Sequence, residues 1–410
     1  MGSIVVLGGA GGVGRVAVEA LSLIDTVDEV VVTDFRTDAV AEVVAALGSA
    51  KLRAATVDVT DTDALVALLR GADAVLNCVG PFYKFGPPTL RAAIAAGVGY
   101  VDICDDLDAT RALLDLDQEA RDAGILALIG MGNSPGLANI FVKMCAEDLL
   151  DDVTSAEIMH IHGGEPSEGA AVLKHRIHAM VNDVPLFVDG EFIDVRQLEE
   201  SGAAFVHTED FPGIGPFPVY PYPHPETITL PVAFPSLRKA TNLGSVYPRA
   251  YFELTQDLVR VGLGEYGTMQ VGDVQVAPVD VAVAILQQER PRLIAEAGIT
   301  EAGGCLRVVV GGTKDGQPHT YVCSLSSHGA GAGEGTGIPA ALGAALHQQG
   351  LLEGGPGVHA PEAIVPVAAI LDLAGQVVSK MSIGDGGGIP LTIEHIAPDG
   401  SKEIIPLAIG

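Results

Sequence analysis

The chain has 410 residues, of which 48% are hydrophobic and 18% are charged, a composition that excludes a disordered chain and leaves room for two or three domains. Its formal net charge of −29 excludes a general nucleic-acid binder, because an acidic surface repels phosphate backbones. Five widely spaced cysteines without a CxxC pair exclude a disulfide framework and a cysteine-based zinc cage. With no signal peptide and no long apolar run, we expect a cytoplasmic protein without a membrane partner.

The first 130 residues alternate short apolar runs with amphipathic segments. The runs predict strands at 4–7, 30–34, 53–58, 74–77, 99–103 and 125–130. Apolar residues recur at helical spacing between them, as at 38–48. Strand–helix alternation with short connections predicts right-handed crossovers and a parallel sheet, and therefore a doubly wound α/β Rossmann domain.

After residue 150 the pattern changes to that of an α+β substrate domain. Asp-Gly pairs at 189–190, 315–316 and 399–400 stand between strand-like runs and predict hairpins, so the second sheet should be mixed or antiparallel. The proline-rich stretch 211–231 is expected to be irregular.

A glycine-rich loop follows the first strand in the sequence VVLGGAGGVGR. Glycines of a G-x-G-x-x-G motif permit a tight turn, a close approach of the backbone to a pyrophosphate, and close packing of helix on strand. The helix that begins there adds positive charge toward the phosphates. The alternative is a tight strand–helix turn without a ligand. The residues predicted to bind a dinucleotide are Gly9, Gly11, Gly12, Val13 and Gly14.

Two charged residues after the second strand bear on the choice of dinucleotide. Asp34 lies twenty residues beyond Gly14, where a carboxylate binds the adenosine ribose and disfavours a 2′-phosphate. Arg36 is placed to accept that phosphate. We expect NAD, with NADP as the alternative.

The fourth strand ends at Asn77, across the topological switch point from the glycine loop. The nicotinamide should lie there, so Asn77, Gly80 and Pro81 are predicted to contact the cofactor. Alternatively, Asn77 caps the end of its strand.

Four motifs resemble the saccharopine dehydrogenase family. Residues 79–106 resemble its GPF-x-x-x-G and A-x-x-x-G-x-x-Y-x-D segments, and MGNSPGLANIF (131–141) resembles the G-x-x-P-G passage between its two domains. GVHAPEAIVP (357–366) resembles its C-terminal signature, and LRVVVGGTKDG (306–316) resembles a strand pair of its lysine 6-dehydrogenase branch. Similar chains place a glutamate after Y-x-D, where this one has Asp105 and Asp106.

The resemblance implies a homodimeric NAD(P)-dependent dehydrogenase or reductase that acts on a C–N bond of an amino acid or amine, as lysine 6-dehydrogenase does. It also implies a C-terminal segment that returns to the first domain. We therefore expect a Rossmann domain at 1–135, a substrate domain at 136–335, a return segment at 336–370 and an extension with a hairpin at 371–410. Two alternatives are reduction of an imine, as in carboxynorspermidine or saccharopine synthesis, and a non-catalytic NAD(P)-sensing regulator.

Polar residues near the expected cleft are candidates for proton transfer and substrate binding. Asp106 is a candidate acid–base group and Asp105 a candidate for binding the substrate ammonium, although both could cap the following helix. Lys174 and His178 share a helical face beside His175, either as a carboxylate site with a proton carrier or as solvated surface.

The proline-rich stretch adds a second set of candidates. Tyr222, His224 and Glu226 occupy alternate positions, so the histidine and the carboxylate are candidates for an oriented acid–base pair. Proline spacing alone is the alternative explanation. Tyr83 and Arg238 are further candidates for substrate contact. His160 and His162 alternate in the same way but lack other ligands at a known spacing, so we expect no metal site.

Overall fold

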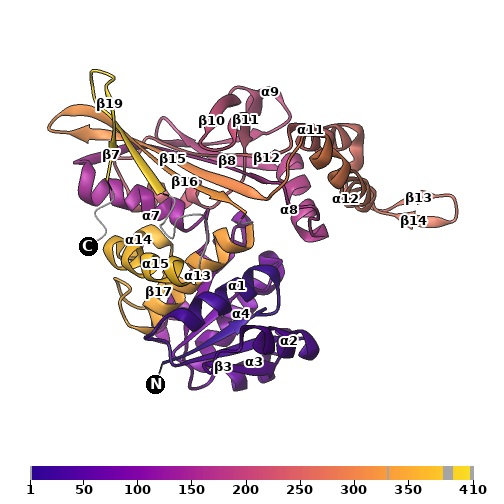
Figure 1. Cartoon of the computed structure of the whole chain (residues 1–410), viewed down its shortest axis with the longest axis vertical. Coiled ribbons are helices and arrows are strands. Elements are labelled where there is room, and N and C mark those ends of the chain that lie inside the picture. Colours follow the sequence, from indigo (N-terminus) through magenta and orange to yellow (C-terminus); the bar gives the residue numbers. More distant parts are fainter. Residues whose placement is uncertain (1, 330–331, 382–390, 407–410) are drawn as a thin grey trace.

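The computed structural model describes residues 2–329, 332–381 and 391–406. Figure 1 shows a parallel sheet with its helices in the lower half and a larger mixed sheet across the upper half. Both expected sheets, one parallel and one mixed, are present, which confirms the predicted fold class.

The lower half is built on a seven-stranded sheet in the order β17-β6-β5-β4-β1-β2-β3, with every pair parallel. Because the order reverses beside β1, the ligand crevice of such a sheet is expected at the carboxyl ends of these strands. The six predicted N-terminal strands are confirmed, and the seventh comes from the C-terminal part of the chain. The strands are β1 (Ser3–Leu7), β2 (Glu29–Asp34), β3 (Leu52–Thr56), β4 (Ala74–Asn77), β5 (Gly99–Asp102), β6 (Leu126–Leu128) and β17 (Gly357–His359).

Helices cover both faces of this sheet. The N-terminal ones are α1 (Gly12–Leu23), α2 (Thr37–Leu47), α3 (Thr62–Leu69), α4 (Phe82–Ala96), α5 (Leu107–Leu114) and α6 (Asp117–Asp122). The C-terminal ones are α13 (Ala332–Gln348), α14 (Pro361–Ile364) and α15 (Val367–Met381). Helix α13 packs against α1 so closely that a Cβ on Gly337 would lie 2.7 Å from the carbonyl oxygen of Val13.

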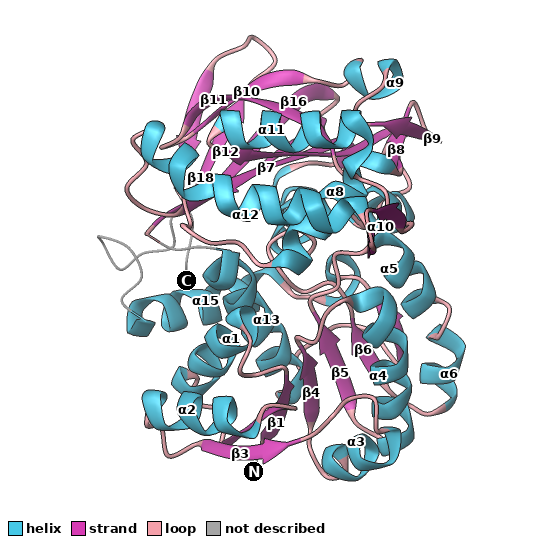
Figure 2. Cartoon of the chain, turned by 90° about the vertical axis from the view of Figure 1, so that its right-hand side faces the viewer, coloured by secondary structure: helices cyan, strands magenta, loops and turns pink. Residues whose placement is uncertain are grey.

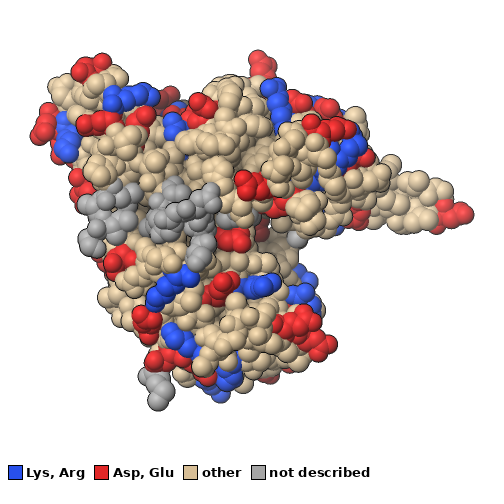
Figure 3. Space-filling model, viewed as in Figure 1, with Lys and Arg blue, Asp and Glu red and all other residues tan. Residues whose placement is uncertain are grey.

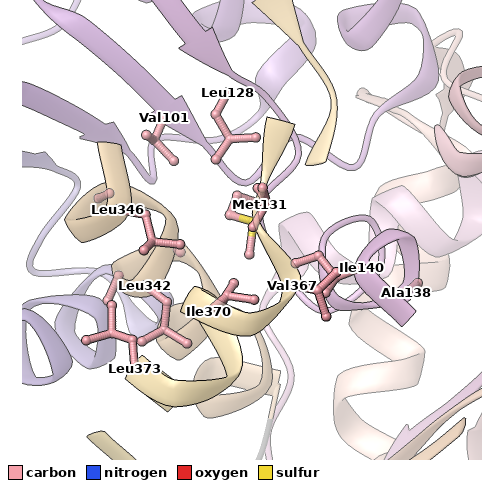
Figure 4. Packing of buried hydrophobic residues seen from close by; sticks show 14 of the residues in the cluster. Val101, Leu128, Met131, Ala138, Ile140, Leu342, Leu346, Val367, Ile370 and Leu373 are labelled. Atoms are coloured by element: carbon pink, nitrogen blue, oxygen red, sulfur yellow. The ribbon is translucent and has the colours of Figure 1, made fainter. Parts of the chain in front are cut away.

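One apolar cluster joins these distant parts of the chain. Leu342 and Leu346 of α13 and Ile370 of α15 lie in a cluster with Val101 of β5 and Leu128 of β6 (Figure 4). All five side chains are buried. The C-terminal segment thus completes the core of the parallel sheet.

The upper sheet has ten strands, of which β10-β11-β12-β7-β15-β16-β18-β19 lie in that order and β8 and β9 join beside β12. Only the β7–β12 pair is parallel. The strands are β7 (Asp152–Gly163), β8 (Asp183–Val188), β9 (Glu191–Arg196), β10 (His207–Phe211), β11 (Gly215–Pro221), β12 (Lys239–Tyr247), β15 (Gly303–Lys314), β16 (Gln317–His328), β18 (Leu391–Ile396) and β19 (Lys402–Ile405).

Helices lie along and below this sheet (Figure 2). They are α7 (Leu137–Met144), the π-helical turn η1 (Cys145–Leu149), α8 (Ala170–Val181), α9 (Glu200–Ala203), α10 (Glu226–Ala233), α11 (Arg249–Leu258), the π-helical turn η2 (Val259–Leu263) and α12 (Pro278–Glu296). A separate ribbon of β13 (Met269–Val271) and β14 (Val274–Val276) projects away from the body (Figure 1).

The three predicted Asp-Gly hairpins are confirmed. Asp189 and Gly190 have φ of 53° and 85° between β8 and β9, and Asp315 and Gly316 have φ of 51° and 71° between β15 and β16. Positive φ at both central residues matches the twist of the flanking strands. The third pair lies between β18 and β19, within the expected extension; residues 382–390 and 407–410 of that extension lie outside the described residues.

The expectation that 211–231 is irregular was wrong. Strand β11 and helix α10 occupy most of it. Pro216 and Pro218 stand two residues apart in β11, so their missing N–H groups lie on one edge of the strand, and β11 still pairs with β10 along the other. Pro225 precedes α10, where a helix needs no N–H partner.

The surface agrees with the acidic composition. On the face shown in Figure 3, Asp and Glu side chains are spread over both halves with Lys and Arg between them. No helix within residues 2–329, 332–381 and 391–406 is long and apolar enough to cross a bilayer. All five cysteines are free.

Candidate functional site

The candidate site lies where the carboxyl ends of the parallel strands face the mixed-sheet half. Figure 2 shows β4, β5 and β6 running toward the upper half, with α8 and α10 above them. Loops after β1, β4, β5 and β6 therefore meet side chains from α8 and from the segment before α10. This is the edge at which open α/β sheets bind ligands.

The glycine loop after β1 has the geometry that a pyrophosphate needs. Gly8 turns the chain with φ of 73°, and the N–H of Gly11 donates to its carbonyl at 2.9 Å. A Cβ on Gly14 would lie 2.1 Å from the same carbonyl oxygen, so only glycine fits there. A Cβ on Gly12 would meet nothing within 4 Å, so the first turn of α1 opens outward. Gly9 and Val13 belong to the same turn, so the five predicted loop residues lie together.

Asp34 and Arg36 are paired beside this loop. The Arg36 guanidinium donates to both carboxylate oxygens of Asp34, from Nε at 3.0 Å and from NH2 at 3.2 Å. Burial disfavours the Asp34 carboxylate, but the hydrogen bonds and charge of Arg36 hold the pKa of Asp34 below its usual value. Arg36 is half-exposed and also reaches the carbonyl of Ala10 at 3.5 Å. A ribose or a 2′-phosphate arriving here meets a carboxylate that already has a cationic partner.

The ends of β4, β5 and β6 are joined by a buried polar network. The Asn77 amide donates to the Tyr100 hydroxyl at 3.0 Å, and this hydroxyl donates to Asp102 at 2.9 Å. Asp102 also accepts from the N–H groups of Cys104 at 3.0 Å and Gly130 at 2.7 Å. Burial is the main cause that raises the pKa of Asp102 to about 6. The Tyr and Asp of the Y-x-D motif thus hold the strand ends in place.

Asn77 is engaged in this network through its amide and at a second point. Its side-chain oxygen accepts from the N–H of Val79 at 3.0 Å, so Asn77 caps its strand, the alternative given above. Gly80 and Pro81 follow in the loop before α4, and Tyr83 is exposed in the first turn of that helix.

A first histidine pair crosses between the two halves of the molecule. Nδ1 of His175 on α8 lies 3.1 Å from a carboxylate oxygen of Asp106, the residue before α5. Asp106 makes no side-chain cap to α5, so its carboxylate serves the histidine rather than the helix. Burial disfavours the charged ring, but the carboxylates of Asp105 and Asp106 raise the pKa of His175. The pair lowers the pKa of Asp106 in turn, against the effect of burial.

A second histidine lies in a buried network before α10. Nδ1 of His224 is 3.2 Å from the Ser134 hydroxyl and 3.7 Å from the fully buried Glu226. Ser134 donates a short hydrogen bond to Glu226. Asn242 of β12 donates to Ser134 at 3.1 Å and to Glu226 at 3.3 Å. Ser134 belongs to the passage between the domains, so this network joins that passage to the mixed sheet.

These contacts determine which ring nitrogen each histidine has left to use. In His224, Nδ1 lies 3.2 Å from the Ser134 hydroxyl and 3.4 Å from the amide nitrogen of Asn242, so this nitrogen faces the buried network. Asp106 only accepts, so Nδ1 of His175 is protonated. In neutral His175, Nε2 therefore carries the lone pair, whereas His224 makes its contacts with Ser134 and Asn242 through Nδ1.

Aromatic rings surround His224. Tyr222 meets it edge-on with 5.1 Å between ring centroids, and His160 stacks on it at 5.2 Å. His160 is bonded to Asn242 at 3.1 Å, and burial with the neighbouring His224 keeps the pKa of His160 well below its usual value. Tyr222 also lies 6.0 Å from His175, so it spans the two histidine pairs.

Three candidates make their direct contacts elsewhere, although His178 is close enough to Asp106 for its charge to help lower the pKa of that carboxyl. Lys174 forms an ion pair with Asp280 of α12 at 2.7 Å, and His178 contacts Asn182 and Tyr266. Arg238 donates to the backbone carbonyl of Asp189 at the β8–β9 turn. The structure therefore brings together Asp105, Asp106, His175, Tyr222, His224 and Glu226, but not Lys174, His178 or Arg238.

Sequence reasoning missed several residues of this region. Ser134 stands within MGNSPGLANIF, where no local pattern marks it as functional, and no local pattern marks Asn242 among the Lys, Thr and Ser residues of its strand. A buried charge cluster was also missed: Arg176 and Arg290 both donate to Glu168, and together they lower its pKa to about 2 against the effect of burial. Buried charges that pair across the fold leave no local signal in the sequence.

Comparisons with known proteins agree with this arrangement. Residues 4–128 match the family model described as the saccharopine dehydrogenase NADP binding domain. Carboxyaminopropylagmatine dehydrogenase from Synechocystis is 25% identical over 84% of this chain and 89% of its own length. Carboxynorspermidine synthase from Vibrio cholerae is 27% identical over 68% of this chain and 69% of its own.

A solved structure shows the same fold. Saccharopine dehydrogenase (L-Glu forming) from Saccharomyces cerevisiae superposes with a TM-score of 0.68 at 17% identity, covering 97% of this chain and 100% of that one. Residues 4–128, which include the glycine loop, match an NADP binding domain, so the cofactor of this chain is NAD(P). Residues 4–128 are therefore similar to the saccharopine dehydrogenase NADP binding domain, in a chain whose fold is that of saccharopine dehydrogenase.

Proposed function

We propose that this oxidoreductase reduces the C=N bond of an imine, which an amine and an aldehyde form with loss of water, to a secondary amine. The observation that carries the proposal is the meeting of two histidine–carboxylate pairs, His175–Asp106 and His224–Glu226, at the carboxyl edge of the cofactor-binding sheet. Reduction of an imine adds a hydride to carbon and a proton to nitrogen. When bound, NAD(P)H supplies the hydride, so the protein has to position the imine and handle the proton.

His224 is the residue that we assign to the proton. Its Nδ1 is held by Ser134, which leaves Nε2 to exchange a proton with the substrate nitrogen. Glu226 is buried behind the ring, where its negative charge stabilises the protonated imidazole. Tyr222 and His160 pack on the ring and limit its movement.

Asp105, Asp106 and His175 form the other side of the site. Two neighbouring carboxylates favour a cationic amine, and the net charge of −29 draws such a molecule toward the protein. The names of the two relatives, carboxyaminopropylagmatine dehydrogenase and carboxynorspermidine synthase, denote amines joined to a carboxyl-bearing chain. We propose a substrate of that class in preference to lysine itself, which makes the imine-reductase alternative the leading one.

The test is consumption of NADH or NADPH in the presence of an amino acid that bears a terminal aldehyde, together with a panel of diamines and agmatine. Activity is expected with at least one amine. Loss of a general acid typically lowers the rate by a factor of about 10²–10⁴, so His224→Asn should slow turnover by about 10²-fold or more. His207→Asn, an exposed histidine on β10, is the matched control.

Two results would contradict the proposal. Near-wild-type turnover in a folded His224→Asn variant would remove His224 from the mechanism. If the protein binds cofactor but consumes it with no amine in either direction, the NAD(P)-sensing regulator would be the better explanation.

The same assay with Arg36→Ala compares the two cofactors. We propose that Arg36 accepts the 2′-phosphate, so the variant should lose affinity for NADPH more than for NADH. The homodimer stays a prediction that light scattering would check.

A further inference from the structure

Three donor side chains converge in the candidate site. One ring nitrogen from each of His175 and His224 and a carboxylate oxygen of Asp105 all lie within 4.8 Å of one another. Asp105 comes from the loop after β5, His175 from α8 and His224 from the segment before α10, so the set exists only in the folded chain. Two imidazoles and one carboxylate are the ligands that zinc and related transition metals prefer, and calcium and magnesium do not.

The groups behind these donors are arranged as they are behind metal ligands. A metal-bound histidine commonly gives its other N–H to a carboxylate or similar acceptor, which fixes the ring and its tautomer. Asp106 holds Nδ1 of His175 at 3.1 Å, and Ser134, itself bonded to Glu226, holds Nδ1 of His224 at 3.2 Å. Nε2 is the nitrogen that each ring has left to offer. In the described part of the chain, Nε2 of His175 is buried and has no hydrogen-bond partner.

The surrounding charges favour a cation. Asp105 and Asp106 face the rings from the parallel-sheet half, and Glu226 lies behind His224. Arg176, which follows His175 on α8, is paired with Glu168.

We propose that Asp105, His175 and His224 bind one divalent transition-metal ion of the zinc class, with a coordination position left open. Three protein ligands with an open position is the arrangement of exchangeable zinc sites, in contrast to closed four-ligand structural ones. The ion uses the same Nε2 atoms that would meet the substrate nitrogen. It therefore excludes the amine, and the site acts as a point of inhibition by metal; this last step rests on the proposed function.

The test is titration of the metal-free full-length protein with Co²⁺, followed by visible absorption, and with Zn²⁺, followed by calorimetry. One ion per chain is expected, with the intense absorption of low-coordinate Co²⁺. Asp106→Asn removes only the group behind His175 and should weaken binding by about 10–100-fold. Asp105→Asn and His175→Asn remove a ligand each and should weaken binding more than Asp106→Asn does. His207→Asn should bind as the wild type does.

Circular dichroism and thermal unfolding of each metal-free variant show that it is folded. Absence of a one-to-one Co²⁺ or Zn²⁺ complex in the wild type, or equal affinity in folded Asp105→Asn and His175→Asn, would overturn the site. Zinc inhibition that rising amine concentration relieves supports the shared position. Metal binding that amine does not compete with would overturn the shared position of metal and amine, but not the metal site. Amine turnover by a protein that binds no metal would overturn the metal site, but not the proposed function.

Discussion

At the scale of single residues, the buried histidines of this chain differ in what their surroundings do to them. His347 on α13 donates from Nε2 to the carbonyl of Leu126 at 2.9 Å and lies against Gly99, where a Cβ would come within 1.9 Å of its ring. No carboxylate within residues 2–329, 332–381 and 391–406 contributes to its pKa, and burial lowers that pKa. Burial also acts on His175, yet the carboxylates of Asp105 and Asp106 raise its pKa. The presence of a carboxylate partner, more than burial, therefore decides whether the pKa of a buried histidine is raised or lowered.

His347 makes stability depend on pH. Its pKa in the folded chain is below the unfolded value of about 6.5, so its neutral form stabilises the fold at higher pH and that stability is lost as pH falls from about 6.5 through the folded pKa. We expect the free energy of unfolding by urea to fall between about pH 7.5 and about pH 5.5, and His347→Gln to lose part of this fall.

His207→Gln, on an exposed strand, should keep the whole decline. If the wild type and His347→Gln lost stability equally over this range, His347 would not be a source of the pH dependence.

At the scale of elements, the β18–β19 hairpin shows how the C-terminal part of the chain is attached. Strand β18 pairs with β16 and buries Leu391 and Ile393 against the core, whereas Ile404 of β19 is exposed. A chain of side chains crosses the three strands: His319 lies 2.8 Å from His395, which lies 3.0 Å from Glu403. The hairpin therefore adds the last two strands at one edge of the mixed sheet.

This attachment should depend on one face of β18. Ile393→Ala should lower the free energy of unfolding by about 2–5 kcal/mol, because it leaves a cavity in a packed cluster. Ile404→Ala makes the same chemical change on an exposed side chain and should stay within about 0.5 kcal/mol of the wild type. Denaturant unfolding followed by circular dichroism measures both, and equal effects would contradict the burial of this face.

At the scale of the whole molecule, the parallel sheet depends on residues from the far end of the chain. Strand β17 extends the sheet beside β6, and α13 and α15 complete its apolar cluster (Figure 4). The domain limits expected at 135, 335 and 370 stay predictions, and α15 runs across the last of them.

A fragment of residues 1–150 should therefore lack a cooperative unfolding transition and bind the dye ANS, because it exposes the surface that α13 covers. The full chain under the same conditions is the control. A fragment that unfolds cooperatively and binds no dye would show that the first 150 residues are sufficient for this fold.

Local patterns predicted much of this protein because their causes are local. Glycines at Gly9, Gly11 and Gly14 and alternating apolar runs specify a strand, a turn and a helix within a few residues. Asp-Gly pairs likewise specify hairpins through their own backbone angles. The prolines misled the prediction because their effect is not local. In β11 it depends on which edge of the strand pairs with a neighbouring strand.

The sequence by itself determined the parallel sheet, the cofactor loop, the hairpins and the resemblance to a family, all of which rest on short-range geometry. It also named six of the residues that meet in the site. Only the tertiary structure decided that Asp106 faces His175 instead of capping α5, that Ser134 and Asn242 orient His224, and that Lys174 pairs elsewhere. These contacts join residues up to about a hundred positions apart, and packing of two domains, which no local pattern records, brings them together.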